Sequence, residues 1–343
     1  MHPDLIDLTG VSRIAVLTGV GSWLPPTQVP NRAVVSERLD TLVRERIGIR
    51  SRHRVDPGMA TGDMAVEAGM RALKSAGVEQ VDALVLATTT PDRPVPATAP
   101  DVASRLGLGT VAAFDLGAGC SGFLYGCGVA TGLIASGTAR RVLVIAADSM
   151  TTITNPKDPS TAPLFGDGAG AVVLECGAPG TPGALGPMVW GSDGELGDAI
   201  VLPAGGSRQR SAGTETAASD HFVHMRGTDV FRHAVRRMSQ AAREAVRGAG
   251  WSLAEVDRFI AHQGNAAITA AVADTLRFPP DRMPSNIASV GNTAAASIPL
   301  LLADAAASGT VRGGDKVLLV AFGSGLTWAA TTLTWPTDCT ALL

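Results

Sequence analysis

Two stretches of the chain recur later in the same order, and this internal repeat constrains the fold more than any other feature. Residues 72–90, ALKSAGVEQVDALVLATTT, resemble residues 245–265, AVRGAGWSLAEVDRFIAHQGN, because each reads as a helix end, a glycine, Val-Asp and a buried strand. Residues 134–149 likewise resemble residues 306–324, and both contain Ala-Ser-Gly-Thr between a helix and an apolar strand. Helix–strand junctions look alike in many α/β proteins, but two matched pairs with an identical tetrapeptide favour duplication.

The duplication pairs two positions that carry chemically useful side chains. Cys120 lies 15 residues before Ala135, where the first tetrapeptide begins, and Asn292 lies 15 residues before Ala307, where the second begins. Both lie near expected helix starts and among small residues, in GAGCSG and GNTAAAS. Small residues permit two backbones to approach closely. We therefore expect two helices, related by a pseudo-twofold axis, to bring their N-termini together at the centre of the molecule.

Apolar strands alternate with helical segments along the chain, and 45% of the residues are hydrophobic. Strands that are apolar throughout are typical of sheets covered by helices on both faces. With two duplicated halves, this pattern predicts an α/β fold of five layers, α-β-α-β-α. A Gly- and Pro-rich segment, residues 176–190, marks the boundary, so we expect one half over residues 1–180 and the other over residues 181–343.

Charge and composition exclude several classes of function. The net charge of −3 gives no general attraction to nucleic acid or to an anionic membrane surface, and no apolar run reaches membrane-spanning length. Only residues 44–54, RERIGIRSRHR, are locally basic, which fits either a solvated strand end or a landing place for phosphates or an acidic carrier protein. The first residues lack a secretion-signal pattern, and the four cysteines lack CxxC or zinc spacing. We therefore expect a cytoplasmic protein with neither a metal nor another cofactor.

Cys120 is the candidate nucleophile. A thiol at a helix N-terminus lies at the positive end of the helix dipole, which favours the thiolate, and nearby amide N–H groups can hold an oxyanion. A free cysteine is more often buried and inert. That alternative is a good description of Cys127 and Cys176.

His262 and Asn292 are the candidate partners of Cys120. His262 directly follows the buried strand VDRFIA, and α/β proteins commonly place their sites at such strand ends. Taken alone it fits a structural histidine better, but its equivalence to residues 88–90 in the first half favours a place in the site. Asn292 carries an amide donor that, with His262 Nε2–H, can polarise a thioester carbonyl where an enolate oxygen develops. The ordinary alternative for Asn292 is a helix N-cap.

Five motifs follow one another in a characteristic order: FDLGAGCSGFLYG, FGDGAGAVVLE, AHQGN, GNTAAASIPL and AFGSGLTW. Together they resemble the β-ketoacyl-[acyl-carrier-protein] synthase III family of thiolase-fold condensing enzymes, and the similarity runs from residue 17 to residue 335. The resemblance implies a thiolase-like fold and a Cys120–His262–Asn292 triad. It also implies an oxyanion hole formed by the backbone amides of Cys120 and Ser324, a homodimer, and thioesters of acyl carrier protein or coenzyme A as substrates.

The resemblance implies a reaction in two stages. An acyl thioester acylates Cys120, malonyl held on a carrier protein then loses CO₂, and its enolate, stabilised by His262 and Asn292, attacks the acyl-cysteine. The alternative is an acyltransferase on the same fold that delivers the acyl group from Cys120 to an oxygen or nitrogen of a natural-product acceptor. Asn292 favours condensation because its amide helps an enolate, whereas some acyl-transferring relatives have Asp at that place.

Several positions depart from the family pattern and suggest a member from specialised metabolism, such as polyketide biosynthesis. Leu42 and Pro159 replace a Trp and an Arg that commonly clamp the adenine of coenzyme A, so stacking is lost. Val95 replaces a Phe that a partner subunit usually lends to the acyl pocket, and Ala267 replaces an Arg associated with carrier docking. The residues expected to contact the substrate or the carrier are Leu42, Arg46, Arg50, Val95, Met150, Pro159, Phe165 and Asn265.

Overall fold

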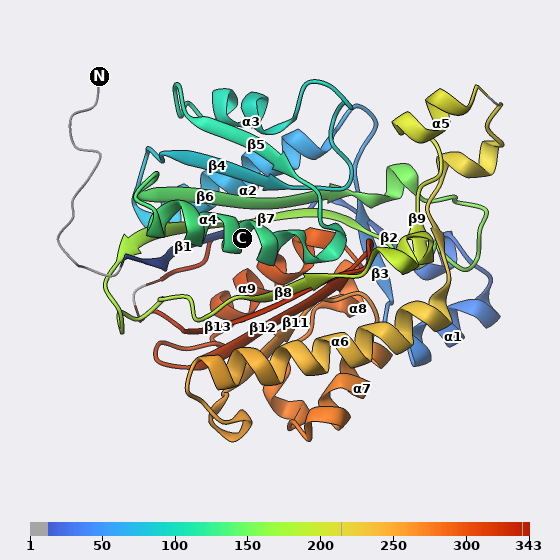
Figure 1. The fold of residues 1–343 in the computed structure, drawn as a ribbon. Helices are drawn as coiled ribbons and strands as arrows, with labels where there is room; N and C mark the ends of the chain where they lie inside the picture. Colours follow the sequence, from blue (N-terminus) through green and yellow to red (C-terminus); the bar gives the residue numbers. More distant parts are fainter. Residues whose placement is uncertain (1–12, 214, 338) are drawn as a thin grey trace.

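Two sheets packed between layers of helices make up the computed structural model, which describes residues 13–213, 215–337 and 339–343 (Figure 1). Up to residue 177 the elements are β1 (Ile14–Trp23), β2 (Thr27–Pro30), α1 (Glu37–Arg46), β3 (Ser51–Arg54), α2 (Thr61–Ala76), β4 (Ala83–Ala87), α3 (Ala99–Arg105), β5 (Ala112–Leu116), α4 (Gly122–Ala135), β6 (Arg141–Ser149) and β7 (Asp167–Gly177). After it they are β8 (Val189–Ser192), β9 (Ile200–Val201), α5 (Ser207–Ala212), β10 (His224–Met225), α6 (Gly227–Gly248), β11 (Arg258–Ala261), α7 (Ala266–Leu276), α8 (Ile287–Val290), α9 (Ser297–Ala307), β12 (Lys316–Gly323) and β13 (Thr327–Thr334).

The layers follow the predicted order α-β-α-β-α. The larger sheet has the strand order β1-β7-β6-β4-β5, and the smaller sheet has the order β11-β12-β13-β8. Helices α2 and α3 cover the outer face of the larger sheet, α6 and α7 cover the outer face of the smaller one, and α4 and α9 lie between the sheets (Figure 1). The central apolar cluster draws residues from both sheets and both middle helices. The predicted fold class is therefore confirmed.

The two sheets use separate parts of the chain. Strands of the larger sheet come from residues 14–177, and strands of the smaller sheet come from residues 189–334. The segment between them includes isolated bridges to strands of both sheets, at Ala184 with Val16 and at Leu185 with Leu333. The division of the chain at residue 180 stays a prediction.

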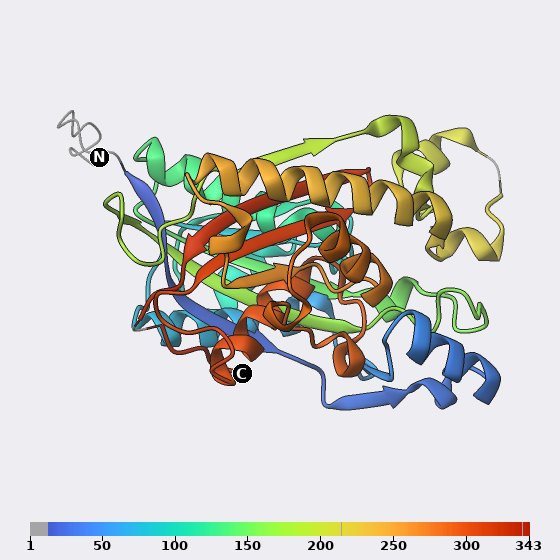
Figure 2. The same ribbon diagram turned by 90° about the horizontal axis from the view of Figure 1, so that it is seen from below.

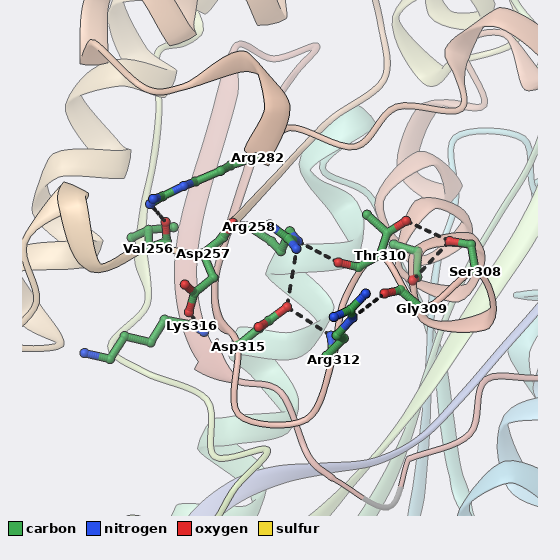
Figure 3. Close-up of polar contacts among 11 residues, drawn as sticks. Val256, Asp257, Arg258, Arg282, Ser308, Gly309, Thr310, Arg312, Asp315 and Lys316 are labelled. Atoms are coloured by element: carbon green, nitrogen blue, oxygen red, sulfur yellow. Dashed lines mark hydrogen bonds and ion pairs between the residues drawn. The ribbon is translucent and has the colours of Figure 1, made fainter.

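The two halves share a pattern of hydrogen bonds as well as a sequence pattern. The N–H of Asp82, just before β4, donates to the carbonyl of Arg141, and Asp82 Oδ2 accepts from the N–H of Arg141, both at 2.9 Å. Asp257, just before β11, makes the same two bonds with Lys316, both at 2.8 Å (Figure 3). A short carboxylate thus closes the start of two neighbouring parallel strands in each half. This accounts for the repeated Val-Asp.

The repeated tetrapeptide forms the same turn twice. Ser136 and Thr138 lie with their hydroxyl oxygens 2.9 Å apart, and Ser308 and Thr310 repeat this distance (Figure 3). The glycine between each pair has a φ of 75° in the first half and 69° in the second. Glycine adopts that left-handed conformation without steric cost, which explains its place in both copies. The duplication inferred from the sequence therefore extends to local geometry.

The starts of the two middle helices lie against each other. A Cβ on Gly122, the first residue of α4, would lie 3.1 Å from the Cβ of Ala87 and 3.3 Å from the Cβ of Ala295. Ala295 belongs to the 3₁₀ turn Ala294–Ala296, which leads directly into α9. The small residues around both helix starts permit this close packing, as the repeat predicts.

Helix α6 runs across the outer face of the smaller sheet (Figure 2). Its buried residues recur every four positions at Val230, Ala234 and Met238, which gives the helix one apolar face and one charged face. Although α6 has 22 residues, it is too polar to lie in lipid. Across the described residues, none of the helices combines the length and the apolar content needed to cross a bilayer.

The locally basic stretch is partly internal. Arg52 in β3 is only 2% exposed, and its guanidinium donates to Asn31 Oδ1 and to the carbonyl of Pro163. The interpretation of residues 44–54 as a solvated strand end is therefore wrong for Arg52. Strands β2 and β3 form a separate two-stranded antiparallel sheet, and the Arg52 guanidinium ties it to the segment that precedes β7.

Candidate active site

A cavity of about 380 Å³ lies where α6 and β9 approach the starts of the two middle helices. Cys120, His262, Asn292 and Ser324 all contribute to its wall. The remainder of the wall is mostly apolar and includes residues from β9, β10, α6 and α7. The structure therefore brings the three predicted triad residues and the predicted oxyanion-hole residue to one cavity.

Cys120 lies in the 3₁₀ turn Gly119–Ser121, immediately before α4. Gly323, at the end of β12, packs so tightly against this turn that a Cβ on it would collide with the backbone N of Cys120. A Cβ on Gly119, whose φ is 52°, would lie 2.7 Å from the backbone N of Ser324. The small residues around Cys120 thus let this turn lie directly against the turn that follows β12.

We expect Gly323→Ala to destabilise the protein by about 1–3 kcal/mol, because the added methyl group must displace backbone atoms rather than a flexible side chain. Thermal unfolding measures the effect. The control is Gly132→Ala in α4, where an added Cβ has no heavy atom within 4 Å. That variant should be neutral or stabilised by up to about 1 kcal/mol, since alanine favours helix. Equal unfolding midpoints for the two variants would contradict the close approach.

Burial works against the thiolate form of Cys120. Burial, and to a smaller extent the charge of Asp148, raise the pKa of Cys120 to about 12, although its own backbone N–H opposes the rise. The helix dipole supplies at most about 2 kcal/mol, which corresponds to a pKa change of roughly 1.5. That is smaller than the rise from 9.0 to about 12. Packing in an apolar cluster with Met150 and Phe165 therefore opposes the thiolate that the helix N-terminus favours, and the thiolate stays a prediction.

Asp148 is a buried carboxylate that sequence reasoning did not single out. It is fully buried in β6, and its Oδ1 accepts hydrogen bonds from the N–H (2.7 Å) and the hydroxyl (2.6 Å) of Thr89. Its Oδ2 accepts from the N–H of Ala295 at 3.0 Å, so it links the end of β4 to the turn before α9. Desolvation raises the pKa of Asp148 to about 6 against these hydrogen bonds. An acidic residue inside the apolar strand RVLVIAADS was the available signal.

His262 is held from one side and open on the other. Its backbone N–H donates to the carbonyl of Val320 at 2.9 Å, and its Nδ1 lies 2.7 Å from Ser297 Oγ. A Cβ on Gly264 would lie 2.6 Å from Nε2, so the glycine leaves that nitrogen uncovered, and both residues line the cavity. Burial lowers the pKa of His262 to about 4. The imidazole is therefore neutral at physiological pH.

Asn292 is fixed by its backbone and by one end of its amide. Its N–H donates to the carbonyl of Leu164, and its carbonyl accepts from the N–H of Gly166, both at 2.9 Å. Its Oδ1 accepts from the N–H of Ala294 at 3.0 Å, which ties the side chain to the turn before α9. Nδ2 makes no hydrogen bond to any residue that the structure describes, and Asn292 lines the cavity. One end of the amide thus holds the backbone of the turn, whose N-cap is Thr293, while the other end stays available as a donor.

Ser324 presents its backbone to the cavity from the turn between β12 and β13. Its carbonyl accepts a hydrogen bond from Thr327 Oγ1 at 3.1 Å, and the same hydroxyl lies 2.8 Å from the carbonyl of Ala118. Within the described ranges, the Ser324 N–H has no acceptor. A free N–H beside the turn that holds Cys120 fits the donor expected of an oxyanion hole.

The remaining predicted contact residues fall into two groups. Met150, Phe165 and Asn265 line the cavity, and Asn265 Oδ1 also accepts from the N–H of Ala267 at 2.9 Å, which caps α7. The others are exposed and lie outside the cavity wall: Leu42, Arg46, Arg50, Val95 and Pro159. Contact of this second group with substrate or carrier stays a prediction.

Sequence reasoning missed two contributors to the site. One is Ser297, which touches His262 from the first turn of α9. The other is the N-terminal part of α6, where Val230, Phe231 and Ala234 line the cavity. The amphipathic pattern of α6 was a signal for a helix, but it does not say that the apolar face is shared between the smaller sheet and a cavity.

Two family profiles match this chain. Residues 114–194 match the profile of 3-oxoacyl-[acyl-carrier-protein] synthase III, and residues 246–335 match the profile of the C-terminal part of those enzymes. The β-ketoacyl-[acyl-carrier-protein] synthase III 3 of Streptomyces coelicolor is 53% identical over 331 residues, which cover 95% of this chain and 98% of the relative. The chain belongs to the β-ketoacyl-[acyl-carrier-protein] synthase III family. The resemblance stated from five motifs is confirmed.

Solved structures of synthase III enzymes share the fold. The enzyme from Pseudomonas aeruginosa has a TM-score of 0.87 at 42% identity, with 95% of this chain and 99% of that chain covered. A priming β-ketosynthase from a polyketide biosynthetic pathway has a TM-score of 0.87 at 33% identity, with 97% and 100% covered. The fold is therefore the thiolase fold of the synthase III family, and the chain is a condensing enzyme of the acyltransferase class, as predicted.

Proposed function

We propose that this synthase III acylates Cys120 from an acyl thioester and then condenses the acyl group with malonyl-carrier protein by decarboxylative Claisen chemistry. One observation carries the proposal: a single cavity is walled by the Cys120 thiol, by the side chains of His262 and Asn292, and by Ser324, whose N–H is free among the described residues. A nucleophilic sulfur beside several N–H donors suits reactions that pass through oxyanions.

Loading of the acyl group needs a nucleophile and an oxyanion hole. The sulfur of Cys120 attacks the carbonyl carbon of the thioester, and the carbonyl oxygen becomes an oxyanion held by the N–H groups of Cys120 and Ser324. The carbon–sulfur bond to the carrier then breaks. The carrier leaves as a thiol, and the proton that Cys120 loses balances the proton that the carrier sulfur gains.

Condensation needs donors for an enolate. The bond between the malonyl carboxylate and the α-carbon breaks, CO₂ leaves, and the electron pair forms an enolate whose oxygen accepts hydrogen bonds from His262 Nε2 and Asn292 Nδ2. The enolate carbon attacks the acyl-cysteine carbonyl, and Cys120 leaves and regains a proton. A neutral imidazole suits this role because it keeps an N–H without carrying a charge, and the pKa of His262, about 4, keeps it neutral.

The wall of the cavity is consistent with a substrate that is carried in on a long arm. Leu202 and Phe231 line it and are also 38% and 39% exposed, so the wall reaches the surface there. We propose that the pantetheine arm of a carrier protein passes this apolar mouth while the carrier stays outside. The exposed Arg46 and Arg50 would attract the acidic face of the carrier.

We also propose the kind of pathway, the oligomeric state and the location of this enzyme. A polyketide or other natural-product pathway fits because a relative in structure is a priming β-ketosynthase of polyketide biosynthesis and because Leu42 and Pro159 depart from the family pattern. A homodimer would cover the edge strand β5, where Phe114 is 36% exposed, and would bury Val95, which is 84% exposed. The four free cysteines suit the reducing cytoplasm.

One assay distinguishes condensation from the alternative, which is acyl transfer to an oxygen or nitrogen acceptor. The protein is loaded with an acyl-carrier protein and then given either malonyl-carrier protein or a hydroxyl or amine acceptor, and the products are analysed by mass spectrometry together with CO₂ release. We expect a carrier-bound acyl chain extended by two carbons, with one CO₂ released for each. An ester or amide formed without CO₂ would favour the alternative.

Free acyl-coenzyme A should be a poorer donor than the same acyl group on its carrier protein. Without an aromatic ring at Leu42 or a guanidinium at Pro159, adenine loses a stacking contact of about 0.5–2 kcal/mol, or roughly 2–30-fold in affinity. The measurement is kcat/KM for both donors. As a matched variant, Leu42→Trp should improve the coenzyme A value and leave the carrier value unchanged, because Leu42 is exposed enough to accept a larger ring. Equal kcat/KM values for the two donors of the wild-type protein would contradict the lost clamp.

A further inference from the structure

We propose that Ser297 is a positioning residue that holds the His262 imidazole in the tautomer with its proton on Nε2. Ser297 is the first residue of α9 and is 1% exposed. Its Oγ lies 2.7 Å from His262 Nδ1 and 3.3 Å from the backbone N of Gln263. The proposal deepens the proposed function, because it assigns how His262 comes to present a donor to the cavity.

The hydrogen-bond inventory of the Ser297 hydroxyl selects the tautomer. A hydroxyl has one hydrogen to donate and can accept two hydrogen bonds. The Gln263 N–H is a donor, so it occupies one accepting position of Oγ. Among the described residues, the only acceptor within reach of the hydroxyl hydrogen is His262 Nδ1. The hydroxyl therefore donates to Nδ1, and the proton of the neutral ring lies on Nε2.

The opposite tautomer would leave a buried donor without a partner. If Nδ1 carried the proton, it would donate to Ser297 Oγ, which also accepts from Gln263, and the hydroxyl hydrogen would have no acceptor within the described parts of the chain. Leaving a buried polar hydrogen unpaired is costly, because water is excluded from it. With Ser297 almost completely buried, the bond to Nδ1 is the one arrangement that satisfies every group.

The surroundings fix both partners of the hydroxyl. Gln263 is 2% exposed, its Nε2 donates to the carbonyl of Ala261 at 2.8 Å, and its Oε1 accepts from Ser285 Oγ at 2.6 Å. His262 is anchored through its backbone N–H to Val320. These bonds hold residues 262 and 263 in place beside Ser297, so the Gln263 N–H and the imidazole both lie within reach of its hydroxyl. The proton on Nε2 is thus prepared for an oxygen in the cavity before substrate arrives.

The first test reads the tautomer directly and needs no substrate. The full chain, which has six histidines, is labelled with isotope-enriched histidine, and His262 is assigned from the spectrum of His262→Asn. Nitrogen NMR distinguishes a protonated ring nitrogen from an unprotonated one. We expect the wild-type His262 to show a protonated Nε2 and an unprotonated Nδ1. A protonated Nδ1 in the wild-type protein would overturn the proposal, whatever the variants do.

The second test asks what the bond does in the reaction. Ser297→Ala should lower the rate of malonyl decarboxylation by about tenfold, the lower end for loss of a group that orients a functional histidine. It should shift the NMR signals toward a mixture of tautomers, and acyl loading should change less than decarboxylation. The conservative Ser297→Thr keeps a hydroxyl and should restore the wild-type tautomer. Full decarboxylation by Ser297→Ala with an unchanged His262 spectrum would also overturn the proposal.

A matched control removes another buried serine hydroxyl. Ser239 in α6 is 4% exposed and its Oγ has no hydrogen-bond partner among the residues that the structure describes, so Ser239→Ala should leave both the His262 spectrum and the decarboxylation rate unchanged. Failure of the proposed function and failure of the tautomer proposal can also be told apart. A wild-type protein that never decarboxylates malonyl thioesters would contradict the proposed function while the spectrum still decides the tautomer.

Discussion

Incubation with an accepted acyl-carrier protein is expected to increase the mass of the protein by one acyl group, and Cys120→Ala is expected to abolish this gain completely. Cys120 is the one cysteine of four that lines the cavity, and it lies against the backbone of the turn after β12. Intact-mass spectrometry measures the result. The control is Cys127→Ala, because Cys127 is 2% exposed in α4 and should not accept the acyl group. An undiminished mass gain in Cys120→Ala would contradict the assignment.

The pH dependence of the reactivity of Cys120 provides a second test. The thiolate is the reactive form of cysteine. Because burial and Asp148 raise the pKa of Cys120 to about 12, the thiolate fraction increases about tenfold for each pH unit below that value. Alkylation of Cys120 by iodoacetamide should therefore keep accelerating up to about pH 10. A plateau near neutral pH would show that the positive helix end outweighs burial.

Much of the fold followed from the repeat alone. The two Ala-Ser-Gly-Thr segments predicted a duplication, and the structure gives them matching Ser–Thr hydroxyl distances of 2.9 Å. The equal spacing from those turns to Cys120 and Asn292 also predicted that two helix starts meet. Such features are predictable because they depend on local backbone geometry and on small side chains. The ordering of strands within each sheet depends on contacts that no short segment encodes.

The candidate site was less predictable in its supporting residues. Cys120, His262 and Asn292 each had a local signal, namely small neighbours or the end of an apolar strand. Asp148 had only its own charge, and its effect on Cys120 depends on how β6 aligns with β4 and with the turn before α9. Ser297 is 35 residues from His262, and only the packing of α9 brings them together. Sequence patterns therefore identify the reacting groups more easily than they identify the residues that position those groups.

Replacement of the two proposed enolate donors should reduce malonyl decarboxylation by roughly 10²–10³-fold, the usual effect of losing one preorganised oxyanion donor. Acyl loading should fall less, because its oxyanion is assigned to the N–H groups of Cys120 and Ser324. His262→Ala tests one donor. Asn292→Asp tests the other more sharply than alanine does, because a carboxylate oxygen can still accept from the Ala294 N–H and so preserve that hydrogen bond.

The two stages are measured separately on the same preparations. Intact mass reports loading of Cys120, and CO₂ release from malonyl-carrier protein reports decarboxylation. Because the pKa of His262 is about 4, the wild-type imidazole stays neutral from about pH 5 upward, and decarboxylation should show no loss as pH increases through 6.5, the ordinary pKa of histidine. A variant that decarboxylated normally but loaded poorly would reverse the assignment of His262 and Asn292. A wild-type rate that fell as pH increased past 6.5 would instead favour the imidazolium, rather than the neutral Nε2–H, as the donor. The same fall in Asp148→Asn would exclude the ionisation of Asp148, whose pKa is about 6, as its cause.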